Sequence, residues 1–175
     1  MIRWAQKSPD GKKALFQALG KLYVRDLNSG KTKRLTKQNE HDEYYPRFSN
    51  DGKSVVYTTW DDQKLGHVRK ASLRSGKSEV LTQTAGHYIE PAFSPDGSLV
   101  TYRKFTGGYL LDPKNSTEPG IYVLNVKKKT SERISQSGMQ PHFAGSNDRV
   151  YFTSYVSGTP YTETELVSVN LAGKE

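Results

Sequence analysis

A turn sequence that returns at nearly regular intervals is the feature that most constrains this chain. It reads Ser-Pro-Asp-Gly at residues 8–11 and 94–97, and Ser-Asn-Asp-Gly at residues 49–52. The first two Asp residues are 41 positions apart and the next two are 45 apart. A Pro-x-Phe sequence stands before the second and third turns and occurs once more at residues 141–143. Self-similarity at such a period indicates a repeat architecture.

Short apolar or alternating runs fill the space between the turns. The first run of each unit follows its turn, at residues 14–18, 55–60, 99–104 and 150–154, and the second at residues 22–27, 68–73, 121–126 and 166–171. A third, shorter run covers residues 34–36, 80–82 and 133–135. The runs are rich in β-branched and aromatic residues, and Gly, Pro, Asn and Asp bound them, which is typical of strands. Because no segment shows sustained 3.6-residue periodicity, the sequence predicts no helix.

Four antiparallel strands per repeat of 41–50 residues predict an all-β fold, a β-propeller with three to four blades. The approximate units are 1–37, 38–83, 84–136 and 137–175. The last unit stops after its third strand, so the sequence predicts part of a larger propeller. Open blade edges are templates for pairing, and we therefore expect that the chain is able to associate with itself.

Composition narrows the possible functions. The chain has no Cys, which excludes disulfides, thiolate metal sites and a Cys nucleophile. No apolar run approaches the ~20 residues of a membrane-spanning helix, and residues 1–9 lack the apolar core of a signal peptide. The net charge of +8 comes from Lys and Arg that occur in all units among acidic residues. Without a basic helix or aromatic platform, no nucleic-acid partner is expected.

The residues of the repeat resemble a known family. The sequence Glu-Pro-Ala-Phe-Ser-Pro-Asp-Gly at residues 90–97 is similar to the consensus of TolB-type propeller repeats. A narrower resemblance involves the stretches 18–24, 57–62, 86–91, 107–111 and 118–122. These look like the propeller region of large bacterial proteins in which TolB-like repeats precede a metal-dependent amidohydrolase module.

This resemblance implies an exported, periplasmic or secreted parent whose hydrolase chemistry lies elsewhere in the chain. The metal-binding His-x-His of the amidohydrolase module is absent, because the four histidines are single residues at positions 41, 67, 87 and 142. No catalytic residue, metal ligand or cofactor can therefore be carried over to this stretch.

Three histidines lie near the repeat Pro residues, where the chain enters the innermost strands. We expect their side chains and their neighbours to face the central channel; they are His41, Asp42, Glu43, Tyr44, Tyr45, His87, Tyr88, Glu90, Gln140 and His142. Convergent His and carboxylate groups are able to bind a metal or to serve as acid and base. Binding of a ligand or partner at the channel mouth, and a purely structural role, are the alternatives.

Two loops are further candidates. Trp60, Asp61 and Asp62 form an acidic turn that either contacts a ligand or folds onto its own blade. The stretch 105–119 is the longest without a strand pattern, and long loops are often functional; its Tyr-Leu-Leu at 109–111 would suit docking to another module.

The sequence thus predicts a non-catalytic propeller scaffold whose partner is a protein, a peptide or another module of its parent. Two alternatives stay open. In one, the channel histidines and carboxylates form a metal-dependent hydrolytic site. In the other, the stretch serves only in self-assembly.

Overall fold

The computed structural model describes residues 1–106, 117–156 and 163–174, and these form fifteen strands in four antiparallel sheets. Blade 1 consists of β1 (Ile2–Lys7), β2 (Lys13–Ala18), β3 (Lys21–Asp26) and β4 (Thr32–Arg34). Blade 2 consists of β5 (Asp42–Phe48), β6 (Ser54–Trp60), β7 (Val68–Ser72) and β8 (Ser78–Val80). Each sheet lies within one of the four repeat units.

The remaining sheets follow the same order. Blade 3 consists of β9 (His87–Phe93), β10 (Leu99–Phe105), β11 (Gly120–Asn125) and β12 (Thr130–Ser135). Blade 4 has β13 (Met139–Phe143), β14 (Arg149–Tyr155) and β15 (Thr164–Asn170), and no fourth strand among the described residues. The expected all-β architecture is confirmed: the described ranges contain no helix.

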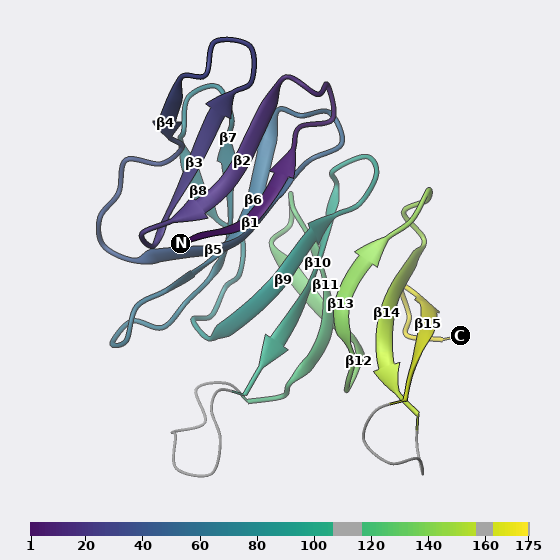
Figure 1. The fold of residues 1–175 in the computed structure, drawn as a ribbon. Helices are drawn as coiled ribbons and strands as arrows, with labels where there is room; N and C mark the ends of the chain where they lie inside the picture. The colour runs from purple at the N-terminus through teal and green to yellow at the C-terminus, as the bar shows by residue number, and fades with distance from the viewer. Residues whose placement is uncertain (107–116, 157–162, 175) are drawn as a thin grey trace.

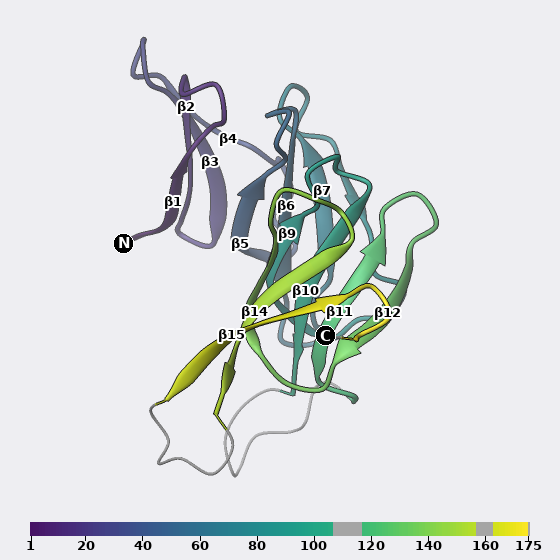
Figure 2. The same cartoon turned by 90° about the vertical axis from the view of Figure 1, so that its right-hand side faces the viewer.

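The blades stand side by side in chain order, from blade 1 in purple to blade 4 in green and yellow (Figure 1). The first strand of each blade is the inner one, and contacts between neighbouring blades run through β5, β9 and β13. The view turned by 90° looks from the side of blade 4, with β14 and β15 in front and blade 1 at the upper left (Figure 2). Within the described part of the chain, no helix has the length and apolarity that a membrane crossing requires.

Three apolar clusters lie between the blades. The cluster between blades 1 and 2 includes Leu15, Leu22 and Tyr57, and the one between blades 2 and 3 includes Val56, Leu81 and Tyr102. Ile121, Phe152 and Val169 belong to the cluster between blades 3 and 4. Since strand residues alternate between the two faces of a sheet, blades 2 and 3 bury both faces.

The recurring Asp residues hold the turns together. In each of three turns a Ser two residues earlier donates a hydrogen bond to the Asp carboxylate, over 2.6 Å for Asp10, 2.6 Å for Asp51 and 2.8 Å for Asp96. The backbone N–H two residues later donates as well. These bonds lower the pKa of the three carboxyl groups. The three Asp residues thus close their turns through the same pair of hydrogen bonds.

The outer strands differ from the sequence prediction. β4 and β8 end before the apolar residues that marked them, because Leu35 and Leu81 turn into the clusters between blades. In the first unit, Trp4 occupies the place of the residue before the repeat Pro, as Tyr45 does in the second unit.

Candidate functional site

A hollow of about 510 Å³ lies where the four inner strands converge. Three consecutive residues of each inner strand line it, namely 4–6, 45–47, 90–92 and 140–142. It is the place at which all four blades contribute side chains to one surface, and we take it as the candidate site.

Each inner strand reaches the hollow through a β-bulge. The pairing of β5 with β6 passes from Tyr44 opposite Thr58 to Arg47 opposite Val56, so β5 carries one extra residue. The same shift occurs in β1, β9 and β13. The bulged residue has a positive φ in every blade: 49° at Trp4, 50° at Tyr45, 56° at Glu90 and 54° at Gln140.

This backbone conformation is uncommon for residues other than Gly and is found at bulges that re-aim a side chain, often beside functional sites. In three blades a Pro follows the bulged residue. Pro cannot donate a backbone hydrogen bond, and it is tolerated here because the bulge already interrupts the hydrogen bonds between the strands.

Hydrogen bonds tie the bulges of neighbouring blades together. The Gln6 amide donates to the carbonyl oxygen of Pro46 and accepts from the backbone N–H of Phe48 over 3.2 Å. In blade 3, the Glu90 carboxylate accepts from the backbone N–H of Gln140 over 2.8 Å, and the Arg103 guanidinium lies 3.9 Å from the same carboxylate. The hollow is therefore held by inter-blade contacts and not by one strand alone.

The lining combines aromatic and polar groups. The rings of Trp4 and Tyr45 are 4.4 Å apart between centroids, and burial together with the Glu90 charge raises the pKa of the Tyr45 phenol. His142 is exposed, and its Nδ1 lies 3.0 Å from the Gln140 carbonyl oxygen. Flat apolar rings beside hydrogen-bonding groups suit a peptide or a sugar more than a small apolar molecule.

Of the residues proposed from sequence, four line the hollow: Tyr45, Glu90, Gln140 and His142. Sequence reasoning missed Trp4 and Arg47, which line it as well. A signal was available for Arg47, because it directly follows a repeat Pro just as His142 does.

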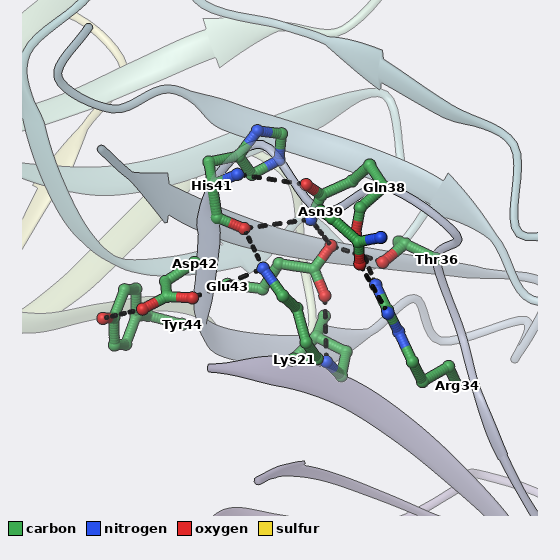
Figure 3. Close-up of polar contacts among 10 residues, drawn as sticks. Lys21, Arg34, Thr36, Gln38, Asn39, His41, Asp42, Glu43 and Tyr44 are labelled. Atoms are coloured by element: carbon green, nitrogen blue, oxygen red, sulfur yellow. Dashed lines mark hydrogen bonds and ion pairs between the residues drawn. The ribbon is translucent and has the colours of Figure 1, made fainter. Parts of the chain in front are cut away.

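Glu43 and His41 lie at the junction of blades 1 and 2 instead of the hollow (Figure 3). Glu43 is fully buried, and its carboxylate accepts hydrogen bonds from Leu22 N–H over 2.9 Å, from the Thr36 hydroxyl and from the Gln38 amide. Because these donors occupy the carboxylate, it is not available to a ligand in the channel. Its place in the structure is that of a contact between blades.

The half-buried imidazole of His41 belongs to the same junction. Within the described ranges, its buried Nε2 has no hydrogen-bond partner. Burial lowers the pKa of the ring, and the nearby Arg69 charge lowers it further. The Lys21 ammonium, which bonds to the backbone carbonyl of His41 and to Asp42, closes the junction from the blade 1 side (Figure 3).

Tyr88 and His87 do not reach the hollow either. Tyr88 is buried in the cluster between blades 2 and 3, where its hydroxyl donates to the Thr84 carbonyl over 2.9 Å. The His87 ring packs between Trp60 and Phe105, with centroids 4.9 Å and 5.4 Å away. Trp60 is thus folded against the next blade.

The acidic turn lies at the rim opposite the Asp-Gly turns, since β5 begins where β6 ends, with Asp42 paired to Trp60. The Asp61 carboxylate accepts from the N–H groups of Gln63 and Lys64, which lowers its pKa. Asp62 accepts from the Trp60 indole N–H over 2.8 Å. Tyr44 lies beside these residues, with its hydroxyl 3.3 Å from Asp42.

The expected convergence of three histidines is not found in the described part of the chain: His41, His87 and His142 occupy three separate surroundings. No group of three His, Cys, Asp or Glu in these ranges is arranged to hold a metal ion. Most of the loop 105–119, including 109–111, lies outside the described residues.

Known proteins share this architecture. The chain is 28% identical over 124 residues to the Tol-Pal system protein TolB of Francisella tularensis subsp. holarctica, a match that covers 69% of this chain and 27% of that protein. It superposes on the crystal structure of TolB from Acinetobacter baumannii with a TM-score of 0.74 and 18% identity, over 100% of this chain and 42% of that one. The chain has the fold of a TolB-type β-propeller.

The fold is shared with an enzyme too. Oligogalacturonate lyase in complex with manganese matches with a TM-score of 0.74 and 16% identity, over 95% of this chain and 49% of that one. No protein-family model matches the chain. The chain spans less than half the length of the two TolB proteins that it matches. Because the same fold occurs in a lyase, the fold alone does not decide between binding and catalysis.

Proposed function

We propose that this chain is a non-catalytic propeller module that binds a protein segment or peptide in the hollow between its four inner strands. The supporting observation is the convergence of four positive-φ bulges on one lining of aromatic, amide and charged groups. Such a surface offers stacking and hydrogen bonding from several blades at once. The separate surroundings of the three histidines favour this role over hydrolysis.

The relatives support a proposal about the cellular location of the protein. Their name assigns them to the Tol-Pal system, and we propose a periplasmic or secreted location for the parent of this chain. The proposal that an amidohydrolase module accompanies the propeller rests on the sequence stretches described above alone.

The test is to fill the hollow. A phage-displayed pool of random peptides is selected on the wild-type protein, and the enriched peptides are then measured against two variants. Ala92→Trp places a large ring in the hollow, because Ala92 is part of its lining. Ala144→Trp places the same ring on an exposed position outside it.

Enriched peptides should lose at least tenfold in affinity for Ala92→Trp and keep wild-type affinity for Ala144→Trp. Equal binding to both variants, or failure to enrich any peptide, would overturn the proposal. Circular dichroism of both variants checks that the blades remain folded.

A further inference from the structure

The strand order places eight turns at one end of the blades. Neighbouring strands of a blade run in opposite directions, so the turns after the first and third strands of every blade lie at the same end. The turns after β1, β5, β9 and β13 follow the upper edge of Figure 1. We call this end the turn face; it consists of residues 8–12, 27–31, 49–53, 73–77, 94–98, 126–129, 144–148 and 171–174.

The turn face and the opposite end of the blades carry opposite charge. The turn face has nine Lys and Arg against four Asp, a formal charge of +5. In the described ranges, the connections at the opposite end have two Lys against five Asp and Glu, a formal charge of −3. The excess of basic residues is largest in the first unit, where residues 1–37 contain ten Lys and Arg against two Asp.

Most of the basic side chains of the turn face point into solvent. Within the described part of the chain, two of the nine form an ion pair: Lys53 lies 4.0 Å from Asp51, and Lys129 lies 3.3 Å from Glu79. All nine except Lys129 are exposed. The four Asp carboxylates of the turn face instead accept hydrogen bonds from Ser hydroxyls of their own turns. The remaining positive charges are therefore accessible to a partner.

The turns of neighbouring blades form one continuous surface. A Cβ at Gly52 of blade 2 would lie 3.7 Å from the Pro9 ring of blade 1. The turns 49–51 and 95–97 line a common hollow of about 140 Å³. The Asp96 backbone N–H of blade 3 donates to the Asn147 side-chain oxygen of blade 4 over 3.3 Å. The charges are thus spread over all four blades.

Hydrogen bonds also fix the outer turns to the inner ones. The Leu27 backbone N–H donates to the Lys12 carbonyl oxygen over 2.9 Å, and Leu73 and Val126 donate to the inner turns of blades 2 and 3 over 2.8 Å and 3.0 Å. Each pair of turns therefore presents its Lys side chains from one rigid base.

The composition of the turn face indicates which kind of partner fits it. Its turns contain no aromatic residue, and Leu27 is the one exposed large apolar side chain among their described residues. The cores of protein interfaces are enriched in aromatic residues and Arg and are depleted in Lys. Proteins that bind single-stranded nucleic acids without sequence preference stack the bases on aromatic rings. Neither feature is found on this face.

The type of basic residue points in the same direction. Eight of the nine basic residues are Lys, and Arg74 is the exception. Arg makes paired, directed hydrogen bonds to a phosphate, whereas Lys acts as a point charge on a flexible stem. A bilayer with anionic headgroups presents mobile phosphates over a wide surface, and a broad array of positive charges is attracted to it without fixed geometry.

We propose that the turn face binds the surface of a membrane that contains anionic phospholipids. Binding through charge is peripheral and falls off within a Debye length of the surface. The hollow between the inner strands is not part of the turn face, so this proposal does not depend on the peptide proposed above.

Two double variants test the proposal. Lys31→Glu/Lys128→Glu reverses two exposed charges of the turn face, and Lys37→Glu/Lys64→Glu reverses two exposed charges at the opposite end. Both lower the net charge by the same amount, and both change one residue of the first unit. Binding is measured by co-sedimentation with vesicles of phosphatidylcholine that contain one third phosphatidylglycerol, and with vesicles of phosphatidylcholine alone. Circular dichroism verifies the fold of each variant.

The wild type should bind the vesicles that contain phosphatidylglycerol and leave those of phosphatidylcholine alone in solution. Lys31→Glu/Lys128→Glu should lose at least tenfold in affinity, while Lys37→Glu/Lys64→Glu should stay within about threefold of the wild type. Raising the salt from about 50 mM to about 500 mM should release the wild type, since exposed charges are screened.

A wild type that does not bind the anionic vesicles would overturn the proposal. So would an equal loss in the two double variants, because net charge and not the turn face would then decide binding. Equal binding to both kinds of vesicle would show that anionic lipids are not what is recognised. If the wild type bound polyglutamate but no vesicle, the turn face would belong to an acidic protein partner and the proposal would be wrong.

Discussion

Glu43 illustrates how a single buried carboxylate joins two blades. It is the second residue of the second inner strand, β5, yet two of its three donors, Leu22 and Thr36, belong to the first unit. A buried polar group is tolerated only when its hydrogen bonds are made. The residue therefore fixes how blade 1 sits on blade 2.

We expect Glu43→Gln to lower the free energy of unfolding by about 1–3 kcal/mol, because an amide NH₂ would face donors that need an acceptor. Urea denaturation measures the change. Glu132→Gln, on an exposed strand position, is the control and should have little effect. Equal stability of the two variants would contradict the role assigned to Glu43.

The lowered pKa of His41 predicts how the stability of the protein changes with pH. Burial and the charge of Arg69 lower its pKa from the usual 6.5, so the unfolded chain binds a proton more readily than the folded one. The contribution of His41 to the free energy of unfolding is therefore fully present above pH 6.5 and is lost as the pH falls below that value. We expect His41→Asn to lose less stability than the wild type between pH 7.5 and pH 5, measured by urea denaturation at both values.

The lowered pKa values of His67 and His87 also make the protein less stable in acid, so His41→Asn should retain part of the dependence of stability on pH. If the variant lost as much stability as the wild type between pH 7.5 and pH 5, His41 would titrate alike in the folded and unfolded chain.

Residue spacing predicted which side chains lie near the inner strands, but not which of them face the channel. Tyr88 and Glu90 are two residues apart, yet the first lies in the core and the second lines the hollow. The difference comes from the bulge at Glu90, which changes the alternation of the strand. No pattern in the sequence near Glu43 predicts that Leu22 and Thr36 of the first unit donate hydrogen bonds to it.

At the scale of the element, the bulge is the unit that repeats most faithfully. Its positive φ recurs in all four inner strands although its residue is Trp, Tyr, Glu or Gln. Backbone position, and not residue type, is thus what the fold keeps constant. Holding such residues in this conformation costs energy that the surrounding ladder and inter-blade bonds offset.

Replacing the bulged Gln140 by Gly should leave stability unchanged or raise it by up to about 1 kcal/mol, since Gly adopts positive φ without strain. The bond to Glu90 is kept because it uses the backbone N–H of residue 140. Glu132→Gly, in an exposed strand position without positive φ, should instead lose about 0.5–1 kcal/mol. Thermal unfolding of both variants measures the two changes in stability. An equal loss of stability in Gln140→Gly and Glu132→Gly would contradict strain at the bulge.

The strands themselves were predicted well, because turn residues and alternating runs are local signals. The second run of the first unit was expected at residues 22–27 and is β3, Lys21–Asp26. The outer strands of the first two units were placed about two residues late, since buried Leu35 and Leu81 follow them, whereas the expected 133–135 lies within β12. Apolar residues mark contacts with the neighbouring blade, and only tertiary packing shows where the ladder ends.

At the scale of the molecule, the clusters couple each blade only to its neighbours. Architectures of this kind lose stability locally, next to the damaged contact. Phe152→Ala removes a ring from the cluster between blades 3 and 4, and such a truncation costs about 3–5 kcal/mol. Hydrogen exchange should increase most in β13–β15 and least in β1–β8. A uniform increase along the chain would show that the blades unfold as one unit.

The uneven charge of the blades gives the molecule a large permanent electric dipole. Residues 1–37 hold a formal charge of +8 and residues 137–175 one of −2, and between them stand blade 2 with a formal charge of 0 and blade 3 with one of +2. In solution the chain must therefore rotate to bring blade 1 first toward any anionic surface within about a Debye length. That orientation presents the same face of the arc at each approach, whatever the identity of the surface.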